Sequence, residues 1–166
     1  MSTARYSRKT LIVGAALAAI AVAGIGALTT ELGTWYYNLQ LPAWKPPDWL
    51  FAPVWTLIFV LAATSGFMAL SRAGRGSPES ARILTLFAVN GVLNITWSVL
   101  FFRLHRPDWA LVEVVLLWAS IVALMFFIAR LSRLASALLI PYFVWVTFAS
   151  VLNYSIVQLN APFGAP

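Results

Sequence analysis

Five long hydrophobic runs follow one another along the chain, separated by short polar segments. The runs cover approximately residues 11–30, 50–70, 81–102, 109–129 and 134–159. Each is about 20 residues or longer, the length of an α-helix that crosses the hydrocarbon core of a bilayer. None alternates in the ten-residue pattern of a membrane β-barrel strand. The pattern predicts an all-α membrane protein, a bundle of five transmembrane helices in one domain over residues 1–166.

The segment between the first two runs, 31–49, is rich in tryptophan and proline. From Trp35 to Trp55 the chain holds four of its eight tryptophans and four of its nine prolines. Proline lacks a backbone donor and restricts the residue before it, so a regular helix is not expected here. We expect an ordered, irregular lid loop at the membrane surface that covers one end of the bundle.

Local signals refine three of the helix ends. Ser77 and Pro78 have the residue types of a helix cap and a first helical position. Pro141 lies inside the fifth run, where it is expected to kink or loosen the helix. The first run follows basic residues, as in a signal peptide, but its length favours a retained helix.

Composition supports the membrane assignment and removes several kinds of site. The chain is 61% hydrophobic and 10% charged, which leaves too few polar residues to cover a soluble protein. It has no cysteine and one histidine, so disulfides, thiolate or histidine-rich metal sites and bis-histidine haem within one chain are excluded. The sequence has no paired carboxylates, no Ser/His/Asp set and no phosphate-binding glycine loop.

The net charge of +6 is explained by topology rather than by nucleic acid. Eight basic residues lie at the N-terminus and in the second and fourth connections between spans: Arg5, Arg8, Lys9, Arg72, Arg75, Arg82, Arg130 and Arg133. Three lie on the other side of the membrane: Lys45, Arg103 and Arg106. This distribution predicts an N-terminus inside and a C-terminus outside. A bacterial membrane is expected, and the pattern fits either an inner or an outer one.

Tryptophan and asparagine recur inside three of the spans. Helical spacing places these residues on one face of each span. The face of the second span holds Phe51, Trp55 and Phe59, and that of the third holds Asn90, Asn94, Trp97 and Phe101. The face of the fifth span holds Pro141, Trp145, Ala149 and Asn153, with Leu152 beside them. One interpretation is structural, with the amides bonding between helices and the indoles filling the core. The other is a pocket for a flat, largely apolar ligand.

Other single residues have simpler interpretations. Trp35, Trp44 and Trp109 suit an interfacial aromatic belt, and Trp118 suits a lipid-facing or packing position. Glu113 is the one acid within a span and is expected to reach the headgroups or to pair with Arg103 or Arg106. A proton relay is the alternative for Glu113. His105 is expected to be an interfacial loop residue.

The sequence resembles the TspO/MBR family over nearly its whole length. The resemblance rests on WYYNLQLPAWKPPDWLFAPVW (35–55), NGVLNITWSVLFF (90–102), RPDWALVE (106–113) and PYFVWVTFASVLNY (141–154). It implies a five-helix bundle, a homodimer, and a ligand cavity closed by the first long loop. It also implies binding of tetrapyrroles such as protoporphyrin IX, with the porphyrin as ligand and no cofactor required.

The resemblance assigns roles to individual residues. Trp55 and Trp145 match tryptophans tied to light-dependent porphyrin degradation in some bacterial members. The ligand-binding residues expected from the resemblance and from helical spacing together are Tyr36, Trp49, Phe51, Trp55, Asn90, Asn94, Trp97, Trp145, Ala149, Leu152 and Asn153.

The sequence departs from the family pattern in three places. Leu41 replaces the usual lysine of the loop, so a cation near the mouth is expected to be missing. Phe59 replaces a frequent tyrosine, and Tyr154 is not followed by the basic residue of the proposed cholesterol motif.

Three functions remain open at this point. A receptor or sensor would bind a tetrapyrrole or another lipophilic small molecule between the tryptophans, within membrane lipids and with no nucleic acid. A catalyst would oxidise porphyrin with light and oxygen, using Trp55 and Trp145 as electron donors. A transporter of porphyrin or sterol is disfavoured, because no inverted repeat and no second intramembrane acid accompany Glu113.

Overall fold

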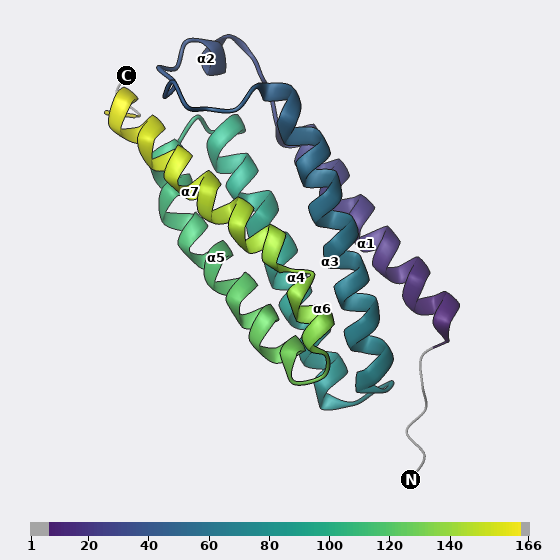
Figure 1. The fold of residues 1–166 in the computed structure, drawn as a ribbon. Helices are drawn as coiled ribbons and strands as arrows, with labels where there is room; N and C mark the ends of the chain where they lie inside the picture. Colours follow the sequence, from purple (N-terminus) through teal and green to yellow (C-terminus); the bar gives the residue numbers. More distant parts are fainter. Residues whose placement is uncertain (1–6, 164–166) are drawn as a thin grey trace.

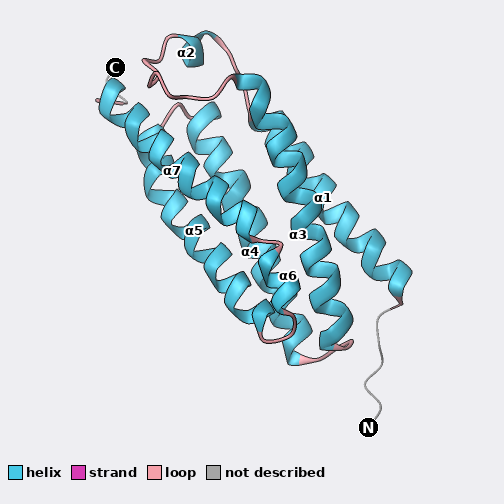
Figure 2. Ribbon diagram, in the orientation of Figure 1, coloured by secondary structure: helices cyan, strands magenta, loops and turns pink. Residues whose placement is uncertain are grey.

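The protein is a bundle of long helices that run side by side, and the first long helix begins at the end of the bundle opposite to that where the last one ends (Figure 1). The computed structural model describes residues 7–163, which contain helices and loops and no strand (Figure 2). Five helical segments are long and apolar enough to cross a membrane, so the prediction of an all-α, five-span fold is confirmed. The elements are α1 (Arg8–Thr29), α2 (Thr34–Tyr37), η1 (Asp48–Leu50), α3 (Phe51–Ala73), α4 (Pro78–Ser98), η2 (Val99–Arg103), α5 (Pro107–Ala129), α6 (Arg133–Ala137) and α7 (Ile140–Asn160).

The ends of α4 follow from local sequence. The Ser77 hydroxyl accepts a hydrogen bond from the N–H of Ser80, and Pro78 occupies the first turn, so the predicted cap is confirmed. At the other end, α4 continues into the π-helical turn η2. A π turn adds a residue to the helical repeat and so re-aims the side chains that follow it. Here it buries Phe101 while Arg103 stays exposed.

The fifth span is not one continuous helix. The short helix α6 ends at Ala137, and α7 begins at Ile140 with Pro141 in its first turn. The interruption lies where a proline removes a helical hydrogen bond, so the loosening expected at Pro141 is present as a break. The lid loop also contains more helix than expected, because the single turn α2 forms before its first proline.

Helix α5 is the centre of the bundle and α1 is its periphery. In the most apolar window of each, 39% of α5 and 6% of α1 is buried. Helix α5 packs against α4 and α7, whereas α1 packs against α3 and, over a smaller surface, α4. Gly91 permits this second contact, because a Cβ there would meet the Val22 side chain at 3.1 Å.

The inward face of α7 differs from the predicted one. Pro141 is exposed, Trp145 and Ala149 are half-buried, and only Asn153 of the expected stripe is fully buried. Residues four apart advance by about 400°, so a stripe built from three such steps rotates by about 120° around the helix. The true inward face begins with Tyr142 and Val146, which are 4% and 1% exposed.

One end of the bundle is the lid end, where the lid loop lies beside η2 and the end of α7. The other is the basic end, formed by the loop 74–77 and the turn 130–132. Arg5, which contributed to the expected orientation, lies outside the described residues.

Candidate ligand site beneath the lid loop

The lid loop is held by a polar cluster at its own centre. The Tyr36 hydroxyl donates to a carboxylate oxygen of Asp48 at 2.7 Å, and the same oxygen accepts from Lys45 Nζ at 2.5 Å. The ammonium group also lies 5.9 Å from the centre of the Tyr36 ring and 5.8 Å from that of Phe51. Burial, together with the hydrogen bond to the Asp48 carboxylate, raises the pKa of Tyr36 above its ordinary value. Tyr36 therefore stays a neutral donor that joins α2 to the start of α3.

This cluster corrects one expectation from the sequence. Leu41 leaves the position of the usual lysine apolar, but a cation is still present, because the Lys45 side chain is 12% exposed and lies against two aromatic rings of the site. Its charge is balanced by Asp48.

Two further contacts fasten the lid loop to the bundle. The side-chain amide of Asn160, at the end of α7, accepts from the N–H of Gln40 and donates to its carbonyl, each at 2.8 Å. This pairing imitates one rung of a sheet and holds the loop backbone over α7. Trp35 stacks on His105, with ring centres 4.3 Å apart, so His105 is a loop residue as expected.

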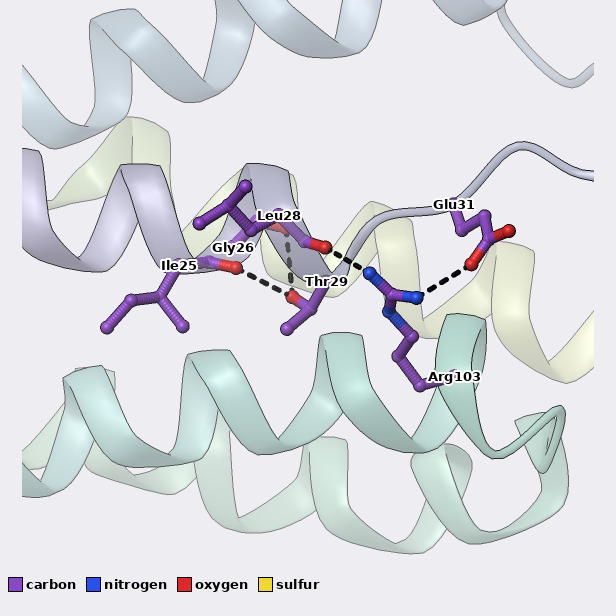
Figure 3. A network of polar contacts seen from close by, with 6 residues as sticks. All are labelled: Ile25, Gly26, Leu28, Thr29, Glu31 and Arg103. Atoms are coloured by element: carbon purple, nitrogen blue, oxygen red, sulfur yellow. Dashed lines mark hydrogen bonds and ion pairs between the residues drawn. The ribbon is translucent and has the colours of Figure 1, made fainter.

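A third contact fixes the chain where it leaves α1. Arg103 reaches from η2 to the carboxylate of Glu31 at 2.8 Å and to the carbonyl of Leu28 at 2.6 Å (Figure 3). The carbonyl is one of the groups that lose their helical partner where α1 ends. Arg103 thereby holds the start of the lid loop against η2.

Aromatic side chains from three helices meet beneath the loop. The Trp145 ring lies 5.4 Å from Phe51 of α3 and 5.3 Å from Phe148 one turn along α7. Trp55 stacks on Phe59 at 5.4 Å and meets the edge of Tyr142 at 6.0 Å. Trp97 of α4 stacks on Phe101, with ring centres 5.2 Å apart. It packs against two groups of buried residues, one that includes Tyr142 and Val146 and one that includes Phe101 and Leu152. Trp55, Trp97 and Trp145 therefore do approach a common region, as helical spacing predicted.

The two asparagines of α4 belong to a buried polar network. Tyr142 donates its hydroxyl to Asn90 at 3.1 Å and accepts from the Asn94 amide at 3.3 Å. Asn90 also donates to Ser120 of α5 at 2.8 Å, and Ser120 donates to the carbonyl of Leu117. The network ties α4, α5 and α7 together at one level. The interhelical role considered for the asparagines is therefore present.

The remaining predicted site residues have different surroundings. Leu152 is buried in the same cluster as Tyr36 and Phe101. Asn153 is 1% exposed, and its amide, with the nitrogen toward Pro107, donates to that carbonyl at 3.0 Å and accepts from the N–H of Leu111 at 3.1 Å. Ala149 is half-buried, and Trp49 is 71% exposed.

A cavity of about 550 Å³ opens between α1, α3 and α4. Its walls are mostly alanine, glycine, leucine and phenylalanine, and its polar floor is formed by Asn90 and Tyr142. Of the predicted ligand residues, Asn90 is the one that this cavity shares. Asn90 and Tyr142 of the polar network, together with Phe59 of the aromatic cluster, thus form part of the wall of an apolar groove on the α1 side.

Two side chains of α5, Glu113 and Trp118, lie outside the aromatic cluster. Glu113 is 8% exposed and neither carboxyl oxygen has a hydrogen-bond partner in the described part of the chain. The expected pairing of Glu113 is wrong, because Arg103 binds Glu31 and Arg106 binds Asp108 instead. Trp118 is 37% exposed and donates its N–H to Thr147 at 3.0 Å, which agrees with a packing position.

Sequence reasoning missed Tyr142, Lys45 and Asp48. Tyr142 had a usable signal, because Tyr142, Val146, Ala149 and Asn153 follow the same 4-3-4 spacing as Asn90, Asn94, Trp97 and Phe101. Lys45 and Asp48 lie in an irregular loop, where no periodicity indicates which side chains meet.

Comparison with known proteins agrees with this architecture. Residues 13–159 match the model of the TspO/MBR family. This chain belongs to the TspO/MBR family. Members similar to it include a tryptophan-rich protein TspO of Chlorobaculum tepidum, 43% identical over 90% of this chain and 94% of the relative. The translocator protein of Sus scrofa is 37% identical over 76% of this chain and 75% of its own length. A tryptophan-rich sensory protein of Cereibacter sphaeroides is 32% identical over 76% and 77%. Family membership and five apolar helices together make this TspO/MBR chain an integral, multi-pass membrane protein.

Proposed function

We propose that the protein is a membrane receptor or sensor that binds a flat hydrophobic ligand, a tetrapyrrole such as protoporphyrin IX, beneath the lid loop. The observation that carries the proposal is the approach of Trp55, Trp97 and Trp145 from three different helices. Indole rings offer large rigid faces for stacking on a conjugated macrocycle. The names of the relatives, sensory protein and translocator protein, fit a receptor and name no ligand.

The ring contacts indicate how binding would occur. Trp145 now contacts both Phe51 and Phe148, so a ligand would replace ring–ring contacts by ring–ligand contacts when the lid loop opens. The exchange costs little, because one set of aromatic contacts takes the place of another. Asn90, Asn94 and Tyr142 would form the floor that limits how deeply the ligand enters.

The test is a titration of the purified protein with protoporphyrin IX in the dark, followed by its visible absorbance. Replacing Trp55 and Trp145 by phenylalanine should weaken binding about 3- to 10-fold for each ring, because a favourable aromatic contact contributes roughly 0.5–1.5 kcal/mol. Trp118→Phe is the matched control, since Trp118 lies on the outer face of α5. If all three variants bind like the parent protein, the site is not beneath the lid loop.

The same titration under light distinguishes a receptor from a catalyst. A receptor retains the porphyrin spectrum, whereas a photochemical catalyst loses it in the presence of oxygen. Catalysis through the indoles requires that this loss slow down in the Trp145→Phe variant. Unchanged loss in that variant would leave binding as the function of the site.

We also propose that the protein lies in a bacterial membrane with its N-terminus inside, its lid end outside and a second copy as partner. Because the chain has no cysteine, a single cysteine can be placed without background. A cysteine at Gly76 of the basic end should be protected from an impermeant thiol reagent in intact cells, and one at Ala43 of the lid loop should react. The reverse labelling would overturn the orientation. Light scattering of the purified protein would give the dimer or refute it.

A further inference from the structure

The two ends of the bundle treat their cations differently. At the lid end, Lys45, Arg103 and Arg106 each pair with a carboxylate. At the basic end, the side chains of Arg82 and Arg130 form no hydrogen bond or ion pair with any described residue, and each lies against one or two aromatic rings instead. Both side chains are exposed. Two arginines at this end therefore keep all their N–H donors available.

These two arginines converge on one ring. The guanidinium carbon of Arg82, from α4, lies 4.9 Å from the centre of Phe127, and that of Arg130, at the end of α5, lies 5.6 Å from the same centre. Arg130 also lies 4.6 Å from the neighbouring ring of Phe126. Two helices thus bring two positive charges to the same aromatic ring.

This arrangement is electrostatically incomplete within the described chain. Two like charges that share one ring repel each other, and contact with the aromatic ring compensates only in part. Arg130 gains from the negative C-terminal end of the α5 dipole, but Arg82 lies near the positive N-terminal end of α4 and gains nothing from it. An anion between the two side chains would relieve the repulsion. A stacked guanidinium keeps its planar N–H fork free at the edge, which suits bidentate binding of phosphate.

The position of the cluster identifies the source of the anion. It lies where two membrane-spanning helices end, at the level of lipid headgroups. Deeper along α5, Val122 and Phe126 are exposed at four-residue spacing and present an apolar surface beneath it. A phosphodiester with acyl chains matches a cationic pair above an apolar strip.

We infer that Arg82 and Arg130, supported by Phe127, form a binding site for the phosphate of an anionic phospholipid at the α4–α5 face of the basic end. The site is separate from the cluster beneath the lid loop and is independent of the ligand proposed there. A general excess of positive charge at this end would attract anionic lipid diffusely, whereas the inferred site holds it at one place.

Native mass spectrometry of the delipidated protein in detergent tests this inference, with phosphatidylglycerol as the probe. Arg82→Gln combined with Arg130→Gln should weaken binding at least about 10-fold, since each variant side chain loses the charge-assisted hydrogen bonds that its guanidinium would make to the phosphate. The matched control is Arg72→Gln combined with Arg133→Gln, which removes the same charge from the same end and should change binding less than 2-fold. Circular dichroism establishes that each variant retains its helices.

Phe127→Leu keeps every charge and removes the shared ring, so it should weaken binding by about 3-fold without affecting the helices. Phosphatidylcholine and inorganic phosphate, titrated in parallel, should bind at least 10-fold more weakly than phosphatidylglycerol. Equal losses in the two double variants would show diffuse attraction and overturn the site. Equal affinity for inorganic phosphate would show that the anion need not be a lipid, and would overturn it as well.

Discussion

The hydroxyl of Tyr142 is the point at which three helices are joined, so its removal is the most informative single change. Tyr142→Phe deletes one oxygen atom and leaves the ring beside Trp55 in place. The oxygen donates to Asn90 and accepts from Asn94, and all three side chains are at most 6% exposed. Removing the oxygen therefore leaves the amide oxygen of Asn90 and the amide nitrogen of Asn94 without a protein partner in the described part of the bundle.

The expected cost follows from what remains unsatisfied. Asn90 keeps its bond to Ser120, but its oxygen loses a donor, and the Asn94 amide loses its acceptor. A buried polar group left unpaired costs roughly 1–3 kcal/mol in soluble proteins. Interhelical hydrogen bonds in membrane proteins contribute less, about 0.6 kcal/mol on average and up to about 1.7. Two bonds lost at one site therefore predict a destabilisation of about 1–2 kcal/mol.

The assay is reversible unfolding of the purified protein in mixed micelles with increasing denaturing detergent, followed by circular dichroism. Tyr154→Phe is the matched control, because that tyrosine lies on the same helix, is 53% exposed and has no hydrogen-bonded hydroxyl in the described chain. Combining Tyr142→Phe with Asn94→Leu should cost less than the sum of the single changes, since the second change removes the group that the first left unpaired. If Tyr142→Phe and Tyr154→Phe agree to within about 0.3 kcal/mol, the network does not join the helices.

Three further changes test the lid loop and the α1 contact. Asn160→Ala should raise amide hydrogen exchange in the lid loop several-fold, because it removes the two hydrogen bonds to the Gln40 backbone. The control Asn38→Ala, at an exposed position of the same loop, should leave exchange unchanged. Equal exchange rates in the two variants would show that Asn160 does not hold the loop. Asp48→Asn keeps an acceptor for the Tyr36 hydroxyl but removes the negative charge that pairs with Lys45. Protoporphyrin, which carries carboxylates, should then bind more tightly, whereas its dimethyl ester should not. An equal gain in affinity for both compounds would mean that Lys45 does not meet the ligand's carboxylates. Gly91→Leu should destabilise the protein by about 1–3 kcal/mol, because α1 must move away from α4 to make room for the new side chain. The control Gly24→Leu, whose Cβ would meet nothing within 4 Å, should cost less than about 1 kcal/mol. Similar losses of stability in unfolding titrations would refute the close packing of α1 on Gly91.

The sequence was sufficient for the spans because hydrophobic length is a requirement of the bilayer and not of any particular packing. It was also sufficient for the inward face of α4. Steps of four, three and four residues return to nearly the same direction, within about 40°, so Asn90 through Phe101 stay on one face. On α7 the chosen residues were spaced by four throughout, and the error accumulated until Pro141 was exposed. The same 4-3-4 rule would have selected Tyr142.

The contacts of the lid loop could not be read in this way. Which cation approaches the site depends on how an irregular backbone places Lys45 beside Asp48, and no local rule links either residue to Tyr36. Pairing across the chain is equally hidden, since Gln40 and Asn160 are 120 residues apart. The pairing of Glu113 was wrong for the same reason, since no local rule shows which carboxylate an arginine will bind. Arg103 pairs with Glu31 and Arg106 pairs with Asp108 instead.

These differences change how the site should be understood. The tryptophans from which a cavity was predicted lie against other aromatic rings. The asparagines from which polar contacts to a ligand were predicted already form hydrogen bonds with Tyr142 and Ser120. A ligand entering beneath the lid loop would therefore meet an aromatic surface whose polar floor is already satisfied. Stacking and shape, rather than new hydrogen bonds from the asparagines, would determine its affinity. A polar group still able to respond is Lys45, because its carboxylate partner Asp48 is 36% exposed and a carboxylate on the ligand would compete with it for the ammonium group. Selectivity among flat ligands would then depend on whether they carry a carboxylate to replace Asp48.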